Sequence, residues 1–327
     1  MDFSLNLGAL DEGKLVKIDE NKLYDVTVIG SGPAAVSAAI YAARKGLNVA
    51  MVGVKIGGQV LDTNEIENII GTVSTTGAKF AETLEKHLKE HEIAFKEGHL
   101  VKEIKEDGKD KLLMTDDGKS YKTKTVIVAT GAKPRSLNIP GEAEYVEREF
   151  ITARLRDGPF YKGLNVAVIG GGNSGVEAAL DLSGIAKSVT LIEFMPELKA
   201  DKVLQEKLAE QSNIKTILNS ATVKVNGNEF VESIVYKSRE TDEEKTLNVE
   251  GMFVEIGLSP RSEVVKDLVE TNKIGEIVIN PENNSTSVAG IFAAGDVTSI
   301  RQKQIIIAMG EGAKAALGAF EYLITKY

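Results

Sequence analysis

Residues 25–35 read Asp-Val-Thr-Val-Ile-Gly-Ser-Gly-Pro-Ala-Ala, and residues 166–175 repeat the pattern as Val-Ala-Val-Ile-Gly-Gly-Gly-Asn-Ser-Gly. Each copy predicts a short β-branched strand, a glycine-rich turn and the start of a helix. The glycines allow a tight turn and a close approach of a pyrophosphate, and the helix N-terminus adds free N–H groups and a partial positive charge. Two copies therefore predict two dinucleotide-binding domains.

Further elements are expected around each copy. Turn dipeptides between apolar runs predict hairpins at Asp107-Gly108, Asp117-Gly118 and Asn226-Gly227. The other expected elements are strands at Asn48–Val52 and Ser188–Ile192, and helices at Ala78–His91 and from about Gly312 to Ile324. The sequence thus predicts an α/β fold of two doubly wound Rossmann-like domains.

The order of the elements predicts that the second domain is inserted into the first. The first half closes on Thr125–Ala132 and the second on Met252–Gly257, after which Ile291–Asp296 returns to the first domain. We expect residues 1–132 and 253–327 to form one discontinuous domain, and residues 133–252 to form the inserted domain.

Composition narrows the function classes. The net charge of −9 argues against nucleic-acid binding, which needs clustered Lys and Arg. No apolar run approaches the roughly 18 residues of a membrane span, and the N-terminus lacks a basic-then-apolar signal, so a cytoplasmic protein is expected. The cysteine count of zero excludes a disulfide or a thiolate in this chain. No metal site is expected, because His87 and His91 lack a third ligand and His99 is isolated.

The motif set resembles the low-molecular-weight thioredoxin reductase family. Its motifs occur here in the family's order, at Gly30–Ala35, Gly57–Gln59, Ala129–Ala132 with Pro134-Arg135, Gly170–Gly175 and Phe292–Asp296. One branch, the flavoprotein subunit of alkyl hydroperoxide reductase, is similar in finer detail at Gly57–Thr63, Glu193-Phe194, Leu198–Asp201 and Lys303–Ala308. The resemblance implies a homodimer with FAD in the first domain and a nicotinamide in the second.

The chain departs from that family at its redox centre. Asp157–Gly163 is a stretch that, in thioredoxin reductases, follows a Cys-x-x-Cys, but Ala153 and Arg156 hold the two cysteine positions here. Neither residue forms a thiolate, and the N-terminal dithiol domain of the reductase branch is not expected in the short stretch before the first strand. Arg156 and Asp157 are the catalytic candidates: a guanidinium near the flavin would favour the reduced anion and bind an anionic acceptor. The alternatives are solvated arginines at Arg154 and Arg156, and a turn residue at Asp157.

The resemblance also implies the cofactor contacts. Those for FAD are Gly30, Gly32, Pro33, Ala34, Gly58, Gln59, Asn68, Val101, Ala129, Thr130, Gly131, Gly295, Asp296, Lys303, Gln304 and Ile305. Those for the nicotinamide dinucleotide are Gly170, Gly172, Asn173, Ser174, Glu177, Glu193 and Gly257. A last helix beginning near Gly310–Ala313 would direct its dipole at the flavin, and Lys303 has the alternative of being a surface lysine.

Glu193 indicates which nicotinamide is used. It ends the second strand, where an acid binds the adenosine ribose diol and repels a 2′-phosphate, so NADH is expected over NADPH. The matching position of the first domain is the neutral Gly53. The alternative for Glu193 is a solvated strand-end acid.

The leading interpretation is an NADH-dependent FAD oxidoreductase. Reduced flavin would pass electrons directly to an external acceptor: oxygen, a quinone, free flavin, ferredoxin or a separate small redox protein. One alternative is a disulfide reductase component that uses a partner protein's dithiol. Another is a non-catalytic FAD or NAD sensor.

Overall fold

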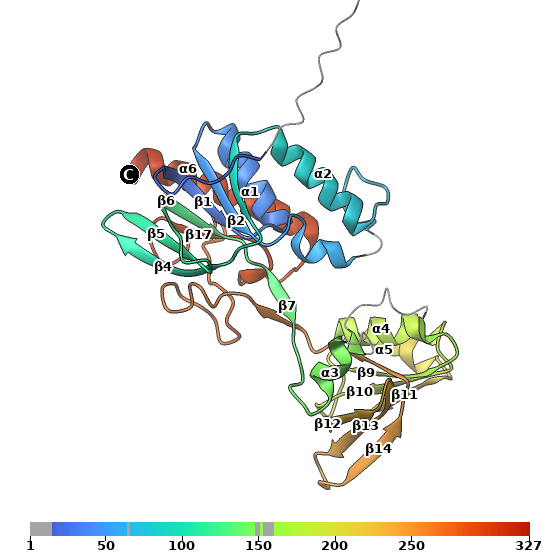
Figure 1. Cartoon of the computed structure of the whole chain (residues 1–327). Coiled ribbons are helices and arrows are strands. Elements are labelled where there is room, and N and C mark those ends of the chain that lie inside the picture. The colour runs from blue at the N-terminus through green and yellow to red at the C-terminus, as the bar shows by residue number, and fades with distance from the viewer. Residues whose placement is uncertain (1–14, 64–65, 148–150, 153–159) are drawn as a thin grey trace, which may run out of the picture. The chain divides into compact units, whose positions relative to one another are not determined.

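The computed structural model describes residues 15–63, 66–147, 151–152 and 160–327 (Figure 1). The chain divides into two units: one contains the described residues up to Ala132 together with Pro260–Tyr327, and the other is Lys133–Ser259. The expected insertion is therefore present. The return to the first unit lies beyond the predicted residue 253, because strand β15 (Gly251–Val254) pairs in parallel with β9 (Asn165–Ile169) of the second unit.

The first unit is built on a seven-stranded sheet in the order β3-β2-β1-β6-β5-β4, with β17 pairing to β6. Its parallel strands are β1 (Leu23–Ile29), β2 (Val49–Gly53), β3 (Ile93–Glu97), β6 (Ser120–Val128) and β17 (Ile291–Ala293). The strands β4 (Val101–Asp107) and β5 (Asp110–Thr115) are antiparallel, and the predicted turns at Gly108 and Gly118 join β4 to β5 and β5 to β6. Both glycines have positive φ, as such turns require.

Helices α1 (Pro33–Arg44), α2 (Gly77–Lys89) and α6 (Ile305–Lys326) belong to this unit, with the 3₁₀ turns η1 (Gly58–Asp62) and η3 (Gly295–Val297). Helix α6 begins at Ile305, so the predicted start near Gly312 was wrong. The β-branched run that opens α6 has weak helix propensity. Packing overrides that propensity, because Ala308, Ala315 and Ala319 of α6 are buried in the core against α1.

The second unit has a parallel sheet in the order β11-β10-β9-β15-β8. Its other strands are β8 (Ile151–Thr152), β10 (Ser188–Ile192) and β11 (Ile214–Ile217), and its helices are α3 (Glu142–Glu147), α4 (Asn173–Ser183) and α5 (Lys202–Ala209). The hairpin predicted at Asn226-Gly227 joins β12 (Ser220–Gly227) to β13 (Val231–Ser238), and β14 (Glu244–Asn248) completes a three-stranded antiparallel sheet. Alternation along β9 places Val168 in one core cluster and Ile169 in the cluster on the other face.

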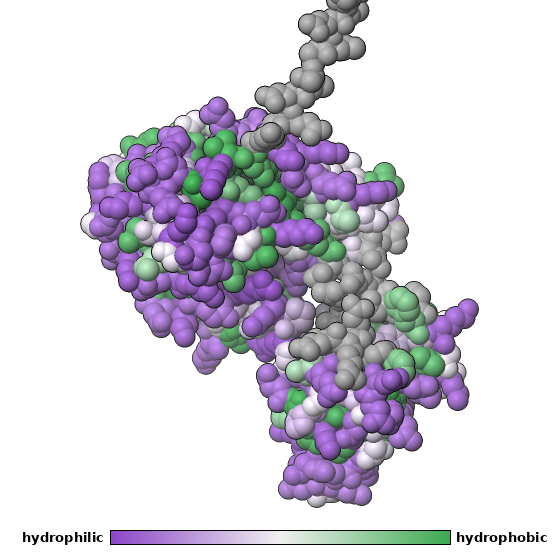
Figure 2. All heavy atoms as spheres, in the orientation of Figure 1, coloured by the Kyte–Doolittle hydropathy of each residue, from purple (hydrophilic) through white to green (hydrophobic). Residues whose placement is uncertain are grey.

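The chain passes between the units twice, through β7 (Ala132–Pro134) and β16 (Leu258–Pro260), which pair with each other. No helix of the described residues has the length and apolarity needed to span a membrane. Figure 2 shows hydrophilic side chains over most of the face that each unit presents.

Candidate dinucleotide sites

The first glycine of each fingerprint is fixed by packing of the turn against a strand. Gly30 (φ 123°) and Gly170 (φ 118°) adopt a conformation that favours glycine. A Cβ on Gly30 would collide with the carbonyl oxygen of Ala129, which follows β6, and one on Gly170 would collide with that of Glu255, which follows β15. Each turn therefore lies at the carboxyl edge of its sheet, beside a neighbouring strand.

The second glycine of each fingerprint faces open space instead. A Cβ on Gly172 would meet no atom of the described residues within 4 Å, and one on Gly32 would meet only the carbonyl oxygen of Gly57, at 3.9 Å. Their φ values of −80° and −78° suit any residue. Neither strain nor packing thus requires glycine, whereas a pyrophosphate approaching the N-termini of α4 and α1 does. Both turns fit a bound dinucleotide.

In the first unit, two distant motifs lie directly against the turn Gly30–Gly32. A Cβ on Gly58 would lie 3.0 Å from the Cα of Gly32, and a Cβ on Gly295 would lie 2.9 Å from the Cβ of Ala34. The predicted residues Gly32, Ala34, Gly58 and Gly295 are therefore gathered around one helix N-terminus. Close backbone approach of this kind is what several glycines in one site permit.

The segment before α6 joins the same unit through polar contacts. Asn68 Nδ2 donates to Gln304 Oε1 at 3.1 Å. Lys303 Nζ lies 2.9 Å from Glu276 Oε1 and donates to the carbonyl oxygen of Thr298 at 2.5 Å. The Lys303 side chain is only 20% exposed, so this residue is not a solvated surface lysine.

The other predicted FAD residues are placed on the ends of elements. These are Pro33 at the start of α1, exposed Gln59 in η1, Val101 at the start of β4 with its side chain in the core, Ala129, Thr130 and Gly131 after β6, Asp296 in η3, and Ile305 at the start of α6. Burial raises the pKa of Asp296, and Lys303 opposes that shift.

Glu311 was missed in the sequence. Its carboxylate is 5% exposed and accepts hydrogen bonds from the Gly295 N–H at 2.9 Å and from Thr298 Oγ1 at 3.2 Å. Burial raises the pKa of Glu311, and the two donors partly offset the shift. The carboxylate fixes the turn at Gly295 from within α6, and an acid in an apolar helix was the signal available.

Removing Lys303 from its partly buried pair is expected to destabilise the first unit. Lys303→Met leaves Glu276, whose side chain is 15% exposed, without its cation. We expect the free energy of unfolding to fall by about 1–3 kcal/mol in chemical denaturation. The control Lys105→Met removes a pair whose side chains are 53% and 50% exposed and should change stability by less than about 0.5 kcal/mol. Equal effects of the two substitutions would contradict the structural role of Lys303.

In the second unit, Glu193 lies on the fingerprint turn. Its carboxylate accepts hydrogen bonds from the backbone N–H groups of Gly171 and of Met195, the latter at 2.7 Å. The residue is 8% exposed, so the alternative of a solvated strand-end acid was wrong. At the matching position of the first unit, a Cβ on Gly53 would lie 2.7 Å from the Cβ of Ser31. Only the second unit has room for an acid there.

The residues predicted on α4 divide into two groups. Asn173 is engaged with Asp201, whose backbone N–H donates to Asn173 Oδ1 at 2.8 Å and whose Oδ2 accepts from Asn173 Nδ2 at 2.9 Å. Ser174 and Glu177 line a hollow of about 890 Å³ together with Glu255 and residues of α5. The remaining predicted residue, Gly257, has φ 90° and is exposed.

Glu255 is a second residue that sequence reasoning missed. It follows β15, at the carboxyl edge of the sheet, and its carbonyl oxygen borders Gly170. Burial raises the pKa of the Glu255 carboxyl to about 7. A charged residue directly after an apolar strand of a parallel sheet was the available signal, since such strand ends border the ligand.

The raised pKa of Glu255 makes stability depend on pH. Because the folded pKa of about 7 exceeds the ordinary value of 4.5, the contribution is fully present below pH 4.5 and is lost as pH rises through 7. Glu255→Gln should therefore match the parent at pH 4 and exceed it at pH 8 by about 1–2 kcal/mol in free energy of unfolding, after a discount for partial exposure. The exposed control Glu206→Gln should show no such dependence. No gain from Glu255→Gln at pH 8 would overturn this expectation.

His99 was expected to be isolated, but the structure places it beside two carboxylates. Its Nδ1 lies 2.7 Å from Asp116 Oδ1 and its Nε2 lies 3.9 Å from Asp117 Oδ2. The three side chains are close enough to hold a metal ion. However, Lys96 Nζ already lies 2.7 Å from Asp117 Oδ2, so a cation is in place without a metal. We assign no metal to this cluster.

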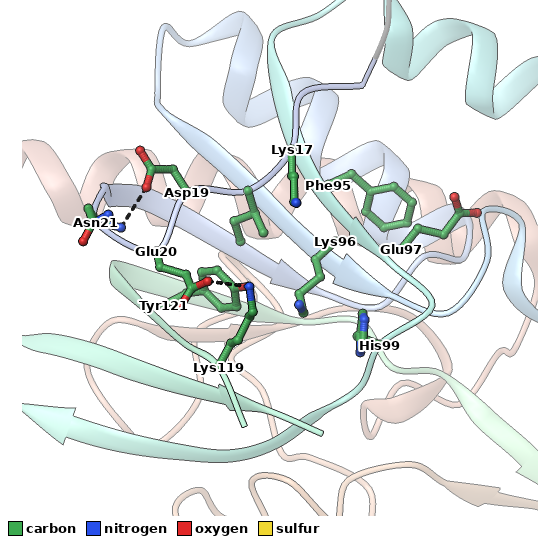
Figure 3. Close-up of a pocket in the computed structure, with 11 residues that line it drawn as sticks. Lys17, Asp19, Glu20, Asn21, Phe95, Lys96, Glu97, His99, Lys119 and Tyr121 are labelled. Carbon is green, nitrogen blue, oxygen red and sulfur yellow. Dashed lines mark hydrogen bonds and ion pairs between the residues drawn. The ribbon is translucent and has the colours of Figure 1, made fainter. Parts of the chain in front are cut away.

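Lys96 and His99 line a hollow of about 700 Å³ in the first unit, and Figure 3 shows both side chains. Lys119, which also lines the hollow, is paired with Glu20 at 2.7 Å. Since the carboxylates of Glu20 and Asp117 already partner two of its lysines, the hollow is no evident anion site.

The predicted catalytic pair is not among these residues. Ala153, Arg154, Arg156 and Asp157 lie outside the described residues, so the roles of Arg156 and Asp157 stay predictions.

Known proteins with similar sequences and structures support the assignment of two dinucleotide sites. The family described as pyridine nucleotide-disulphide oxidoreductase matches residues 24–312. The chain is 48% identical over 301 residues to a protein named NADH dehydrogenase from Bacillus subtilis, covering 92% of this chain and 59% of that protein. It is 50% identical over 306 residues to the F subunit of alkyl hydroperoxide reductase in Staphylococcus aureus, covering 93% of this chain and 60% of that protein. The chain thus spans about three fifths of the length of these curated relatives.

Among solved structures, thioredoxin reductase from Lactococcus lactis superposes with a TM-score of 0.80 at 35% identity, covering 92% of this chain and 99% of that one. The thioredoxin reductase of T. acidophilum gives a TM-score of 0.77 at 36% identity, with coverage of 92% and 99%. The structure and the family match indicate the same architecture. The chain has two fingerprint turns whose second glycines border open space, its second unit is inserted into the first, and the family match covers residues 24–312. This chain belongs to the pyridine nucleotide-disulphide oxidoreductase family.

Proposed function

We propose that this chain is an NADH-dependent FAD oxidoreductase. The observation that carries the proposal is the pair of fingerprint turns, one in each unit, whose second glycines Gly32 and Gly172 border open space at a helix N-terminus. Family membership supports the same chemistry, since relatives include a protein named NADH dehydrogenase and several thioredoxin reductases.

The differences between the two turns support one cofactor for each unit. We place FAD in the first unit, where Gly58 and Gly295 add further backbone approaches to the turn. NADH belongs in the second unit, where Glu193 lies beside Gly171. Each carboxylate oxygen of Glu193 accepts one backbone N–H, and an oxygen with about two lone-pair sites keeps one for a ribose hydroxyl.

FAD bound in the first unit would supply the redox chemistry that accepts a hydride from NADH. The chain's own groups bind and orient the two dinucleotides. The N-termini of α1 and α4 would hold the pyrophosphates, since Gly32 and Gly172 have no side chain to cap them. Lys303, held by Glu276, adds a positive charge to the first unit.

Electrons leave this chain without passing through a thiol of its own, because its cysteine count is zero. The acceptor classes are oxygen, a quinone, free flavin, ferredoxin or a small redox protein. A partner's dithiol is the second candidate, supported by the 50% identity to the F subunit of alkyl hydroperoxide reductase. A homodimer in the cytoplasm is part of the proposal.

The test starts from purified protein reconstituted with FAD. NADH added anaerobically should bleach the flavin, and a panel of acceptors should then restore its absorbance at acceptor-specific rates. A flavin that NADH leaves oxidised would favour the sensor interpretation, and a folded chain that cannot bind FAD would overturn the proposal.

Thiol reagents should not affect this activity. With a cysteine count of zero, iodoacetamide has no thiolate to alkylate, so NADH-driven reduction of a dye should be unchanged after treatment. The control uses a dithiol redox protein as the electron acceptor in place of the dye. Alkylating this acceptor should abolish its reduction. Inhibition of dye reduction would contradict a thiol-free route.

A further inference from the structure

Beside Glu193, the ring of Phe194 is half exposed and stacked by an arginine. Phe194 is 52% exposed. The Cζ of Arg239 lies 3.8 Å from its ring centroid, and Arg239 Nη1 donates to the carbonyl oxygen of Phe194 at 3.0 Å. The guanidinium covers one part of the ring and leaves aromatic surface open to solvent.

Arg239 is held in this position from a separate element. Its Nη1 also donates to Asn219 Oδ1 at 3.2 Å, and its backbone N–H donates to the carbonyl oxygen of Asn219 at 2.9 Å. The backbone N–H of Asn219 donates in turn to the carbonyl oxygen of Met195 at 2.9 Å. The turn after β13 and the loop after β10 are thus tied together. The stack is preorganised and does not need a ligand to form it.

The position of the stack follows from the role of Glu193. The Glu193 carboxylate lies on the Gly171 N–H, where a ribose of the dinucleotide is expected, and Phe194 is the next residue of the chain. The base attached to that ribose is adenine, a flat aromatic ring. Bases stack on aromatic side chains with about 1–3 kcal/mol per base, and a guanidinium adds to such stacks.

We propose that Phe194 and Arg239 form an adenine-binding shelf in the second unit. The adenine ring stacks on the Phe194 ring, and the Arg239 guanidinium holds the Phe194 ring in place. The assignment rests on the proposed function, because it assumes an adenine dinucleotide in this unit. It adds two binding residues from outside the glycine-rich turn. It also gives Arg239 a role other than contact with a 2′-phosphate, since its Nη1 is directed to Phe194 and Asn219.

Titration calorimetry of the FAD-loaded chain with NADH, ADP-ribose and NADPH tests the shelf. Phe194→Leu, which keeps apolar bulk without a ring, should weaken NADH and ADP-ribose by at least about fivefold. Phe194→Tyr should bind as the parent does. Arg239→Gln should weaken all three ligands by a similar, smaller factor. Phe230→Leu, a matched change at a phenylalanine 56% exposed in the same unit, should have no effect.

The outcomes separate the shelf from the proposed function. Parent-like binding of ADP-ribose by Phe194→Leu would overturn the shelf alone, as would equal weakening by Phe230→Leu. A selective loss of NADPH affinity in Arg239→Gln would assign Arg239 to the 2′-phosphate and also overturn the shelf. A parent chain that binds none of the three ligands would overturn the proposed function itself, and the shelf with it.

Discussion

Glu193→Arg is expected to remove the preference of this chain for NADH. The parent should favour NADH over NADPH at least tenfold in kcat/KM, which needs only about 1.4 kcal/mol of differential binding. The substitution removes the carboxylate that accepts the Gly171 and Met195 N–H groups and is placed to accept the ribose diol. It also introduces a cation that attracts a 2′-phosphate. We expect kcat/KM for NADH to fall by about 10–100-fold while that for NADPH rises.

The control is Glu197→Arg, which makes the same change of charge on the loop after β10 at a side chain that is 73% exposed. It should leave the ratio of the two nicotinamides nearly unchanged, because exposed charges are screened by salt. Glu193→Gln keeps the shape and should lose less NADH activity than Glu193→Arg. A parent that prefers NADPH, or an equal effect of Glu197→Arg, would show that Glu193 does not contact the ribose.

Gly32→Ala is the second substitution with a large expected effect, and it should abolish FAD binding without unfolding the chain. An added Cβ would meet only one described atom, at 3.9 Å, and φ of −78° suits alanine. The added methyl would instead occupy the space in which the pyrophosphate approaches the start of α1. We expect bound FAD to fall from about one per chain to below about a tenth, as measured by absorbance after desalting.

Gly30→Ala is the contrasting variant. Its Cβ would collide with the carbonyl oxygen of Ala129, and φ of 123° is strained for alanine. It should therefore lower the thermal midpoint of the protein measured without FAD, which Gly32→Ala should not. If Gly32→Ala lowered that midpoint as much as Gly30→Ala does, its loss of FAD would reflect unfolding and the open space at Gly32 would have no functional meaning.

The two fingerprint turns are alike in sequence and different in what surrounds them. In the first unit, the Ser31 hydroxyl donates to the carbonyl oxygen of Lys55 at 2.7 Å, and the Ser31 side chain occupies the space next to Gly53. In the second unit Gly171 has no side chain, and Glu193 reaches its N–H. The exchange of a serine–glycine pair for a glycine–acid pair is the physical basis for assigning different dinucleotides to the two units.

Short-range features of this protein were determined by its sequence alone. The strand–turn–helix segments at Gly30 and Gly170 and the hairpin turns at Gly108 and Gly227 were all predicted, and the order of such elements along the chain predicted the inserted second domain. Glycine conformation and hydrophobic periodicity act over a few residues, so they can be recognised without knowing the fold. The same reasoning placed Glu193 at a strand end, because the acid follows a fixed register from its turn.

Only the tertiary structure decided which distant side chains meet. Lys303 pairs with Glu276, Asn68 with Gln304, and Arg239 with Phe194, and none of these pairs has a local signal in the sequence. The start of α6 was likewise set by packing on α1, against the weak helix propensity of its first residues. Burial of Glu193, Glu255 and Glu311 depends on the same long-range contacts, because desolvation is a property of the folded surroundings and not of the residue itself.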